Sequence, residues 1–393
     1  MTTPGRLIGV DATRGLALLG MMAVHSLWAY DDNGEVTWHY ALAAGQSAAT
    51  FALLAGLGIA FMTGRRRIQR GEWKGTAASL AARAGVIAAV GLLLGWTDVS
   101  LATVILVYYA VLFLLAIPVV LLSTRVLFAV GTAIAVVVPV LSHLVRPALP
   151  AASGDNIALG QVFTDPVGLL LELTVTGLYP ALPWMAYICI GIAIGRLRLS
   201  EHRVAARLLA IGAAVGVGAW ALSALLLGPL GGESRLYAAA SQSGLSRTEV
   251  SDLLIFGSDG VTPTTTWWWL ATTAPHTSTP LDLLHTIGVT AALLGGLLLL
   301  ARRADKFLLP IGAAGGMTLT LYTAHVLFIN SPLDAFAATP GYLFQVFAVL
   351  VFAVVWRVAV GRGPLEQLAA DAARSARRAV RGRDGASAES PTP

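Results

Sequence analysis

Of the 393 residues, 56% are hydrophobic and only 12% are charged, whereas about a quarter of an ordinary soluble domain is charged. A chain with so little polar surface cannot cover a large water-soluble core, so a soluble globule is excluded. The formal net charge is +5. The basic residues gather in short stretches between apolar blocks, which is typical of membrane-protein loops and not of a nucleic-acid-binding surface.

The apolar blocks are long enough to cross a membrane, because about 20 apolar residues span roughly 30 Å of hydrocarbon as a helix. Backbone polar groups must be paired within each segment in lipid, so each block is predicted to be helical. The sequence therefore predicts an all-α polytopic membrane protein with about ten transmembrane helices. They are expected near residues 7–30, 42–62, 76–96, 100–122, 126–145, 177–196, 208–228, 281–300, 308–329 and 341–358. The first is expected to be a retained span, since it carries charges and no small-residue cleavage site follows it.

The loops of this ten-span arrangement alternate in charge. Basic residues follow every second predicted span, whereas the intervening connections 31–38, 97–100 and 330–340 contain none. Lys and Arg favour the cytoplasmic side, so both termini are predicted to be cytoplasmic. The loop residues that carry this prediction are Arg65, Arg66, Arg67, Arg70, Lys74, Arg125, Arg196, Arg198, Arg203, Arg207, Arg302, Arg303 and Lys306.

Outside the spans, two long outer connections are expected at 146–176 and 228–280. The second contains Trp267, Trp268 and Trp269, which suit either an anchor at the headgroup level or an aromatic platform for a sugar or lipid headgroup. Residues 361–393 are predicted to form a basic cytoplasmic tail, helical to about residue 383 along the inner leaflet and then disordered. The single cysteine, Cys189, is expected to be a small buried apolar residue without a redox or metal role.

The first predicted span carries Asp11, Arg14 and His25, and ionisable residues inside a membrane are candidates for function. Arg14 and His25 are eleven residues apart, or about 1,100° of helical turn, so they lie within about 20° of one azimuth and about 16 Å apart along the axis. Asp11 lies one turn before Arg14 and is expected to pair with it. This face is predicted to line a polar passage.

Four of the seven histidines fall at one predicted depth in the outer half of the membrane. His25, His39, His285 and His325 either form a common site or each satisfy a separate hydrogen bond near a helix end. No His-x-x-His or Glu-x-x-His spacing supports a metal site, so no metal is predicted. The remaining histidines are expected in loops, without a functional role: His143, His202 and His276.

Three patches of the sequence resemble a known group of enzymes. Residues 10–25, with Arg14 and His25 separated by ten residues, resemble the opening helix of the transmembrane acyltransferase superfamily. This group includes the acyltransferase-3 enzymes and the heparan-α-glucosaminide N-acetyltransferase-like proteins. Residues 51–67 resemble its second helix and basic turn, and residues 321–325 resemble its late Tyr/His-bearing helix. The resemblance covers about the first 75 residues and a patch around 310–330.

The resemblance implies that residues 1–360 form a transmembrane acyltransferase-like domain. It would move an acyl group, expected to be acetyl from cytoplasmic acetyl-CoA, to a hydroxyl or amine of an extracytoplasmic glycan or lipid. In this reading Arg14 holds the donor, and the basic turn of Arg65, Arg66 and Arg67 binds the CoA phosphates. That turn could equally serve only to orient the protein in the membrane.

The catalytic base is expected to be His25, with His325 assisting. In the glucosaminide N-acetyltransferases the active histidine follows the first helix, where His39 stands in this sequence, so His39 stays the alternative. Rival readings are a transporter or flippase of a small polar or lipid-linked substrate, or a non-catalytic membrane partner. The predicted partners are membrane lipids, acyl-CoA and a glycan or lipid acceptor, without nucleic acid; a homodimer stays open. The expected location is a bacterial cell membrane.

Overall fold

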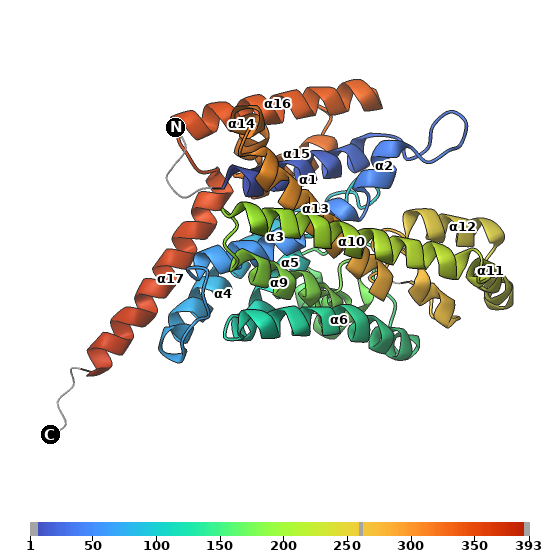
Figure 1. Cartoon of the computed structure of the whole chain (residues 1–393), viewed down its shortest axis with the longest axis horizontal. Helices are drawn as coiled ribbons and strands as arrows, with labels where there is room; N and C mark the ends of the chain where they lie inside the picture. The colour runs from blue at the N-terminus through green and yellow to red at the C-terminus, as the bar shows by residue number, and fades with distance from the viewer. Residues whose placement is uncertain (1–6, 259–261, 389–393) are drawn as a thin grey trace.

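The computed structural model describes residues 7–258 and 262–388, and these residues form a bundle of helices without β-strands (Figure 1). The protein is therefore all-α, as predicted. In chain order the helices are α1 (Ile8–Ser26), α2 (Trp38–Ala43), α3 (Gln46–Met62), η1 (Arg70–Glu72), α4 (Trp73–Leu93), α5 (Leu106–Val119), α6 (Thr124–Val145), η2 (Arg146–Ala148), α7 (Gln161–Thr164), α8 (Pro166–Leu171), η3 (Glu172–Thr176), α9 (Ala181–Gly195), α10 (His202–Leu227), α11 (Gly232–Ser243), α12 (Arg247–Phe256), η4 (Trp267–Ala271), α13 (Pro280–Leu300), α14 (Asp305–Gly315), α15 (Thr318–Ile329), α16 (Ala338–Ala359) and α17 (Pro364–Ala388).

The protein is a multi-pass membrane protein, but the predicted count of about ten spans is not confirmed. Within the described residues, six helices are long and apolar enough to cross a membrane, or up to eight if each of two bent pairs is one span. The expected first and fourth spans do not qualify by length and composition. Helix α1 carries two charges and a histidine, and α5 has only 14 residues.

The predicted span 308–329 is not one continuous helix. It is divided into α14 and α15, which are bent by 66° at a short break. Gly315 ends α14 and Gly316 lies in the break, and glycine is among the weakest helix formers. The freed N-terminus of α15 is held by Glu366, whose carboxylate accepts hydrogen bonds from the backbone N–H groups of Leu319 and Thr320 at 2.6 and 3.2 Å. Loss of the regular hydrogen-bond ladder is thus compensated from a distant part of the chain.

The basic loops gather at one end of the bundle, which we call the basic end. Arg65 Nε donates to the carbonyl of Gly195 at 3.3 Å, and Arg302 donates to the carbonyl of Ser200. The loops after α3, α9 and α13 are thereby joined. Helix α17 lies on this side, and α11 and α12 lie at the opposite end, which we call the far end (Figure 1).

We expect the basic end to face the cytoplasm, and single cysteines test this orientation. Cysteines placed at Gly34, Ser243 and Ala337, all exposed, should react with an impermeant thiol reagent on intact cells. A cysteine at the exposed Gly71 should react only after the cells are permeabilised. The native Cys189 is buried, as predicted, so the background should be low. Labelling of Gly71→Cys on intact cells would overturn the orientation.

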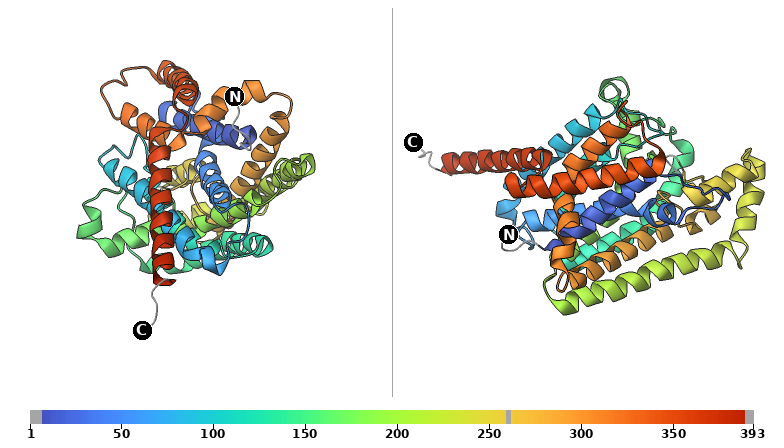
Figure 2. Two further views of the ribbon diagram at one scale, coloured as in Figure 1. Left: turned by 90° about the vertical axis from the view of Figure 1, so that its left-hand side faces the viewer. Right: turned by 90° about the horizontal axis from the view of Figure 1, so that it is seen from above.

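Helix α17 occupies the predicted tail and runs across the basic end of the bundle (Figure 2). It packs against α4 and α15, not only along a lipid surface. Residues 389–393, part of the tail end expected to be disordered, lie outside the described residues.

The far end carries the outer connection predicted at 228–280, which folds into α11, α12 and η4. The three adjacent tryptophans separate there. Trp269 is buried against Leu236 and Val250, Trp268 lies under Arg235, and Trp267 is exposed. Each of the three side chains thus has its own partner within the protein, since Trp267 packs against His143, and a common aromatic platform is not formed.

Candidate functional site

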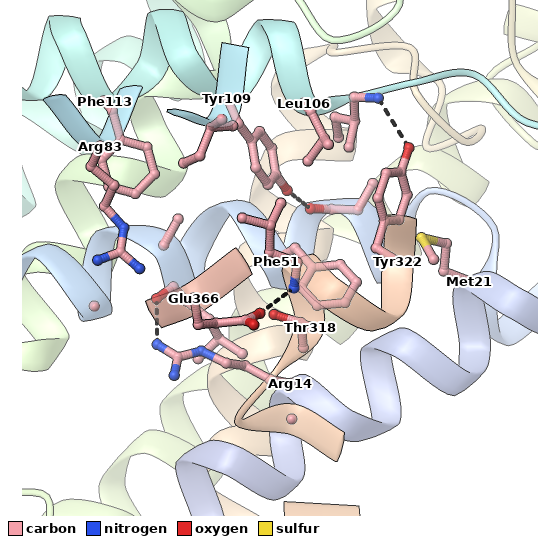
Figure 3. A pocket seen from close by; sticks show the side chains of 18 of the residues that line it. Arg14, Met21, Phe51, Arg83, Leu106, Tyr109, Phe113, Thr318, Tyr322 and Glu366 are labelled. Carbon is pink, nitrogen blue, oxygen red and sulfur yellow. Dashed lines mark hydrogen bonds between the residues drawn. The ribbon is translucent and has the colours of Figure 1, made fainter. Parts of the chain in front are cut away.

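A cavity of about 590 Å³ lies inside the bundle between α1, α3, α4, α5, the break between α14 and α15, and α17 (Figure 3). Each helix contributes residues that repeat every three or four positions, so one face of each helix lines the space. On α3, for example, these residues are Ser47, Ala48, Phe51, Leu54, Ala55, Gly58, Phe61 and Met62. Most of the wall is apolar, with a smaller number of polar groups, as is typical of ligand sites.

Helix α1 contributes Arg14, Met21 and His25 to this wall, so the predicted common face is confirmed. Arg14 Nη2 donates to the carbonyl of Leu54 at 3.2 Å, and Arg14 Nη1 lies 3.7 Å from the Asp11 carboxylate, which confirms the predicted pair. Both interactions fix the guanidinium at the cavity wall. The cavity therefore contains the arginine toward the basic end and the histidine toward the far end.

The basic end of the cavity holds four further arginines: Arg83, Arg362, Arg374 and Arg377. Arg83 comes from α4, and its side chain and that of Arg14 lie on the same side of the cavity as Glu366 of α17 (Figure 3). In the described part of the chain, the only hydrogen-bond partner of Arg83 is the sulfur of Met62, at 3.6 Å, and sulfur is a weak acceptor.

None of these four arginines was predicted as a site residue. Arg83 lies inside the predicted span 76–96, so the rule that selected Arg14 could also have selected it. The other three were assigned to a surface tail. Arg374 and Arg377 reach the cavity because α17 packs on α4, and Arg362 lies just before that helix; the sequence pattern does not specify this packing.

At the far end, His25 and His325 form a direct pair. Their Nδ1 and Nε2 atoms lie 3.1 Å apart, and the rings are stacked with centroids 5.3 Å apart. Nδ1 of His325 lies 2.7 Å from Oε1 of Gln345 on α16, and Nε2 of Gln345 donates to the hydroxyl of Ser26 at 3.3 Å. His325 is buried behind His25, which lines the cavity.

This chain of contacts selects a protonation pattern. Oε1 of Gln345 can only accept, so Nδ1 of His325 carries a proton, and in the neutral ring Nε2 is then an acceptor. Nδ1 of His25 therefore donates to it, which leaves the lone pair of His25 on Nε2. Within the described residues this Nε2 has no hydrogen-bond partner. The arrangement holds a neutral imidazole with one basic nitrogen free at the cavity.

The other two histidines of the predicted layer lie elsewhere. Nε2 of His39 lies 3.1 Å from the hydroxyl of Thr37 and 3.1 Å from the carbonyl of Trp28, in the loop after α1. His285 bonds to the carbonyl of Gly216 at 2.9 Å, between α13 and α10. Neither residue lines the cavity. The structure thus brings together His25, His325 and Arg14, but not His39 or His285.

The basic turn after α3 is also outside the cavity wall. Arg65 donates to the backbone of Gly195, and Arg67 donates to that of Leu121 at 2.5 Å. Arg66 forms two hydrogen bonds with Glu72, which raise the pKa of the guanidinium. The role of these three residues in CoA binding stays a prediction.

Of the three histidines expected in loops, His143 and His202 lie in helices, with His202 as the first residue of α10, and only His276 lies in a loop. His143 lies in the last turn of α6 and packs against Trp267, with ring centroids 4.8 Å apart. His276 does lie in a loop, but it lines the cavity at the far end, near Tyr179. It stands in a connection outside every predicted span, so the sequence pattern gave no signal of this position.

In the described part of the chain, no group of three His, Cys, Asp or Glu side chains is arranged to hold a metal ion.

Comparison with known proteins identifies the family. Residues 6–227 match the family model for the catalytic part of heparan-alpha-glucosaminide N-acetyltransferase. The matched segment includes Arg14, His25 and Arg83, whereas His276, His325 and α17 lie beyond it. No curated protein matches the chain. The members of this family are membrane acetyltransferases, for which an acetyl-CoA donor is implied. Because the match covers more than half of the 393 residues, the chain belongs to the heparan-alpha-glucosaminide N-acetyltransferase catalytic family.

Proposed function

We propose that the protein transfers an acetyl group from cytoplasmic acetyl-CoA to a hydroxyl or amine of a glycan or lipid on the far side of the membrane. The observation that carries this proposal is that one cavity has arginines at its basic end and His25 at its far end. Acetyl-CoA has a polyanionic head, which suits the arginine end, and a thioester at the end of a long arm, which suits the histidine end. Opposite ends of the cavity then serve opposite sides of the membrane.

The arginines would bind the phosphates of the donor. Charge-assisted hydrogen bonds between guanidinium groups and phosphate are among the strongest polar contacts in proteins, and Arg presents a fork that matches the phosphate oxygens. Arg83 is the best placed of them, since its hydrogen-bonding capacity is nearly unused in the described residues. Arg374 and Arg377 at the outer rim would meet the nucleotide end, and Arg14 would lie deeper, along the arm.

In this arrangement, Arg65, Arg66 and Arg67 would contribute to CoA binding only from outside the cavity. The turn that holds them follows Phe61 and Met62, which line the cavity. Each guanidinium has a partner within the protein, so a phosphate would have to compete with that partner. We therefore assign the main phosphate contacts to the cavity arginines.

At the far end His25 would act as general base. Its Nε2 would accept the proton of the acceptor hydroxyl or amine as that group attacks the thioester carbonyl carbon. The carbon–sulfur bond then breaks, and the leaving CoA thiolate takes a proton from His25. His325 and Gln345 would hold His25 in the tautomer with the basic nitrogen toward the cavity. A positioned base of this kind contributes about 10²–10⁴ in rate.

The arginine assignment is tested by the double variant Arg374→Gln/Arg377→Gln. We expect the apparent KM for acetyl-CoA to rise about tenfold with little change in kcat, because a lost charged contact of about 1.4 kcal/mol changes binding tenfold. The variant should also discriminate less between acetyl-CoA and its analogue without the 3′-phosphate. Initial rates of CoA release by the purified protein, with glucosamine and a lipid extract as acceptors, give both values.

The matched control is Arg378→Gln, on the same helix but exposed and outside the cavity. It should leave KM unchanged. The triple variant of Arg65, Arg66 and Arg67 to Gln should raise KM less than the α17 double variant does. A larger effect from the triple variant would move the phosphate site to the basic turn. Absence of any acetyl transfer by the unmodified protein, together with uptake of the acceptor into vesicles, would favour the transporter instead.

A further inference from the structure

The loop between η4 and α13 carries His276 to the far end of the cavity in an unusual backbone conformation. His276 has φ +59° and Ser278 has φ +50°, both in the left-handed region. Residues other than glycine rarely adopt this region, and such conformations are found where the surrounding structure enforces them, often at functional sites.

The surroundings do enforce this loop. Glycines stand where Pro275 approaches other backbones: a Cβ on Gly257 would lie 1.7 Å from the carbonyl oxygen of Pro275, and one on Gly45 would lie 3.0 Å from its Cα. Three hydrogen bonds join the loop to Trp184, Asp282 and Thr262, and a fourth lies within the loop. The hydrogen bonds are Trp184 Nε1 to Ser278 Oγ at 3.0 Å, Ser278 N to Asp282 Oδ2 at 2.9 Å, Thr262 Oγ1 to the Thr277 carbonyl at 2.9 Å, and Thr279 Oγ1 to the Thr272 carbonyl at 2.6 Å.

The imidazole of His276 is held at the cavity wall with its hydrogen-bonding capacity unused. The ring packs edge-on against Tyr179 at 5.1 Å. Its Nδ1 is buried and has no partner among the described residues. Because a buried N–H without a partner is less tolerable than a buried lone pair, the proton is placed on Nε2, the nitrogen that remains available to the cavity. Burial lowers the pKa of His276 to about 4, so the ring is neutral and keeps this one donor.

A donor and an acceptor thus line the same end of the cavity. His25 has a free basic Nε2 there, and His276 has a free Nε2–H. Attack on a thioester needs both, since a proton must leave the nucleophile while negative charge develops on the carbonyl oxygen.

We infer that His276 is a catalytic residue that donates a hydrogen bond to the acyl carbonyl oxygen. This inference rests on the proposed acetyl transfer. As the acceptor oxygen or nitrogen bonds to the carbonyl carbon, His25 takes its proton and the carbonyl π electrons move to the oxygen. The Nε2–H of His276 stabilises that oxyanion. When the carbonyl re-forms, the carbon–sulfur bond breaks and the thiolate receives the proton from His25.

The test is His276→Phe, which keeps a flat ring against Tyr179 but removes the donor. We expect kcat to fall about a hundredfold, the usual effect of losing one oxyanion donor, with KM for acetyl-CoA within about twofold. His276→Asn should recover part of the rate, since Asn tolerates the left-handed region and carries an N–H. The control is His143→Phe, which replaces another buried histidine whose Nδ1 has no partner among the described residues, outside the cavity; its kcat should not change.

A second readout does not depend on turnover. Acetonyl-CoA is an unreactive ketone analogue of acetyl-CoA, and its carbonyl stretch should move to lower wavenumber when it binds the unmodified protein. This shift should be lost in His276→Phe and kept in His143→Phe. A shift that persists in His276→Phe, or full activity of that variant, would overturn the role of His276. Failure of the unmodified protein to bind the analogue would instead contradict the proposed acetyl transfer, and the role of His276 with it.

Discussion

Replacing His25 by Gln should abolish most turnover while leaving a folded protein that still binds the donor. Gln fills a similar volume and can keep a hydrogen bond to His325, but it has no basic nitrogen for the proton of the acceptor. Removal of a positioned base costs about a hundredfold or more in rate, or at least about 2.7 kcal/mol of transition-state stabilisation. Single-turnover CoA release measures the loss, and thermal unfolding with and without acetyl-CoA checks folding and binding.

The same measurements on the neighbouring residues distinguish catalysis from packing. His325→Gln should lose less, about tenfold, because His325 acts on the substrate only through His25. Gln345→Leu should resemble it, since it removes the acceptor that sets the tautomer of His325. His39→Gln should retain turnover, because His39 bonds to the loop after α1 and does not line the cavity.

Opposite results would reassign the base. An active His25→Gln with an inactive His39→Gln would give the role to His39. Full activity of both variants would remove the base from the proposed mechanism.

Much of this site could be predicted from α1 alone, for a physical reason. A helix has a fixed 100° step, so the spacing of Arg14 and His25 determines that they share a face. A charge inside an apolar helix must also find a polar environment, so that face has to border a cavity or other polar groups. Both predictions depend only on residues within one helix, and both agree with the structure.

For His25 and His325, the sequence could predict only that they lie at the same depth in the membrane, not that they are in contact. Residues 300 positions apart meet because α1 and α15 pack together, and the 3.1 Å contact depends on the bend between α14 and α15. The sequence pattern predicted a straight helix there. A bend is stabilised by tertiary contacts such as the Glu366 carboxylate, which local propensities do not reveal.

His276 and the arginines of α17 were missed for a related reason. His276 lies in a connection whose conformation is set by contacts with Trp184, Gly45 and Gly257, none of them near it in the sequence. The α17 arginines look like an ordinary amphipathic surface, because a positively charged helix face has the same pattern beside a membrane and beside a cavity. Only the packing of α17 on α4 shows that this helix face borders the cavity and not the membrane.

The close approach of α1 and α14 leads to the last expected result: Gly315→Leu should strongly destabilise the folded protein. A Cβ at position 315 would lie 1.8 Å from the backbone oxygen of Asp11, and one at Gly15 would lie 2.1 Å from that of Ile311. Small residues let membrane helices pack backbone to backbone, and here they bring Arg14 to the cavity wall. Leucine would force the helices apart at a cost of about 3 kcal/mol or more, since rigid backbone cannot yield as a side chain does.

The matched comparison is Gly218→Leu, a glycine in the middle of α10 where an added Cβ meets nothing within 4 Å. Both variants place the same apolar side chain in a helix, so their hydropathy and insertion should be equal. We expect Gly218→Leu to give a monodisperse peak in detergent with an unchanged unfolding midpoint, and Gly315→Leu to give aggregate or a much lower midpoint. Equal midpoints would mean that α14 can move away from α1 freely, and then Arg14 would not be fixed at the cavity by this crossing.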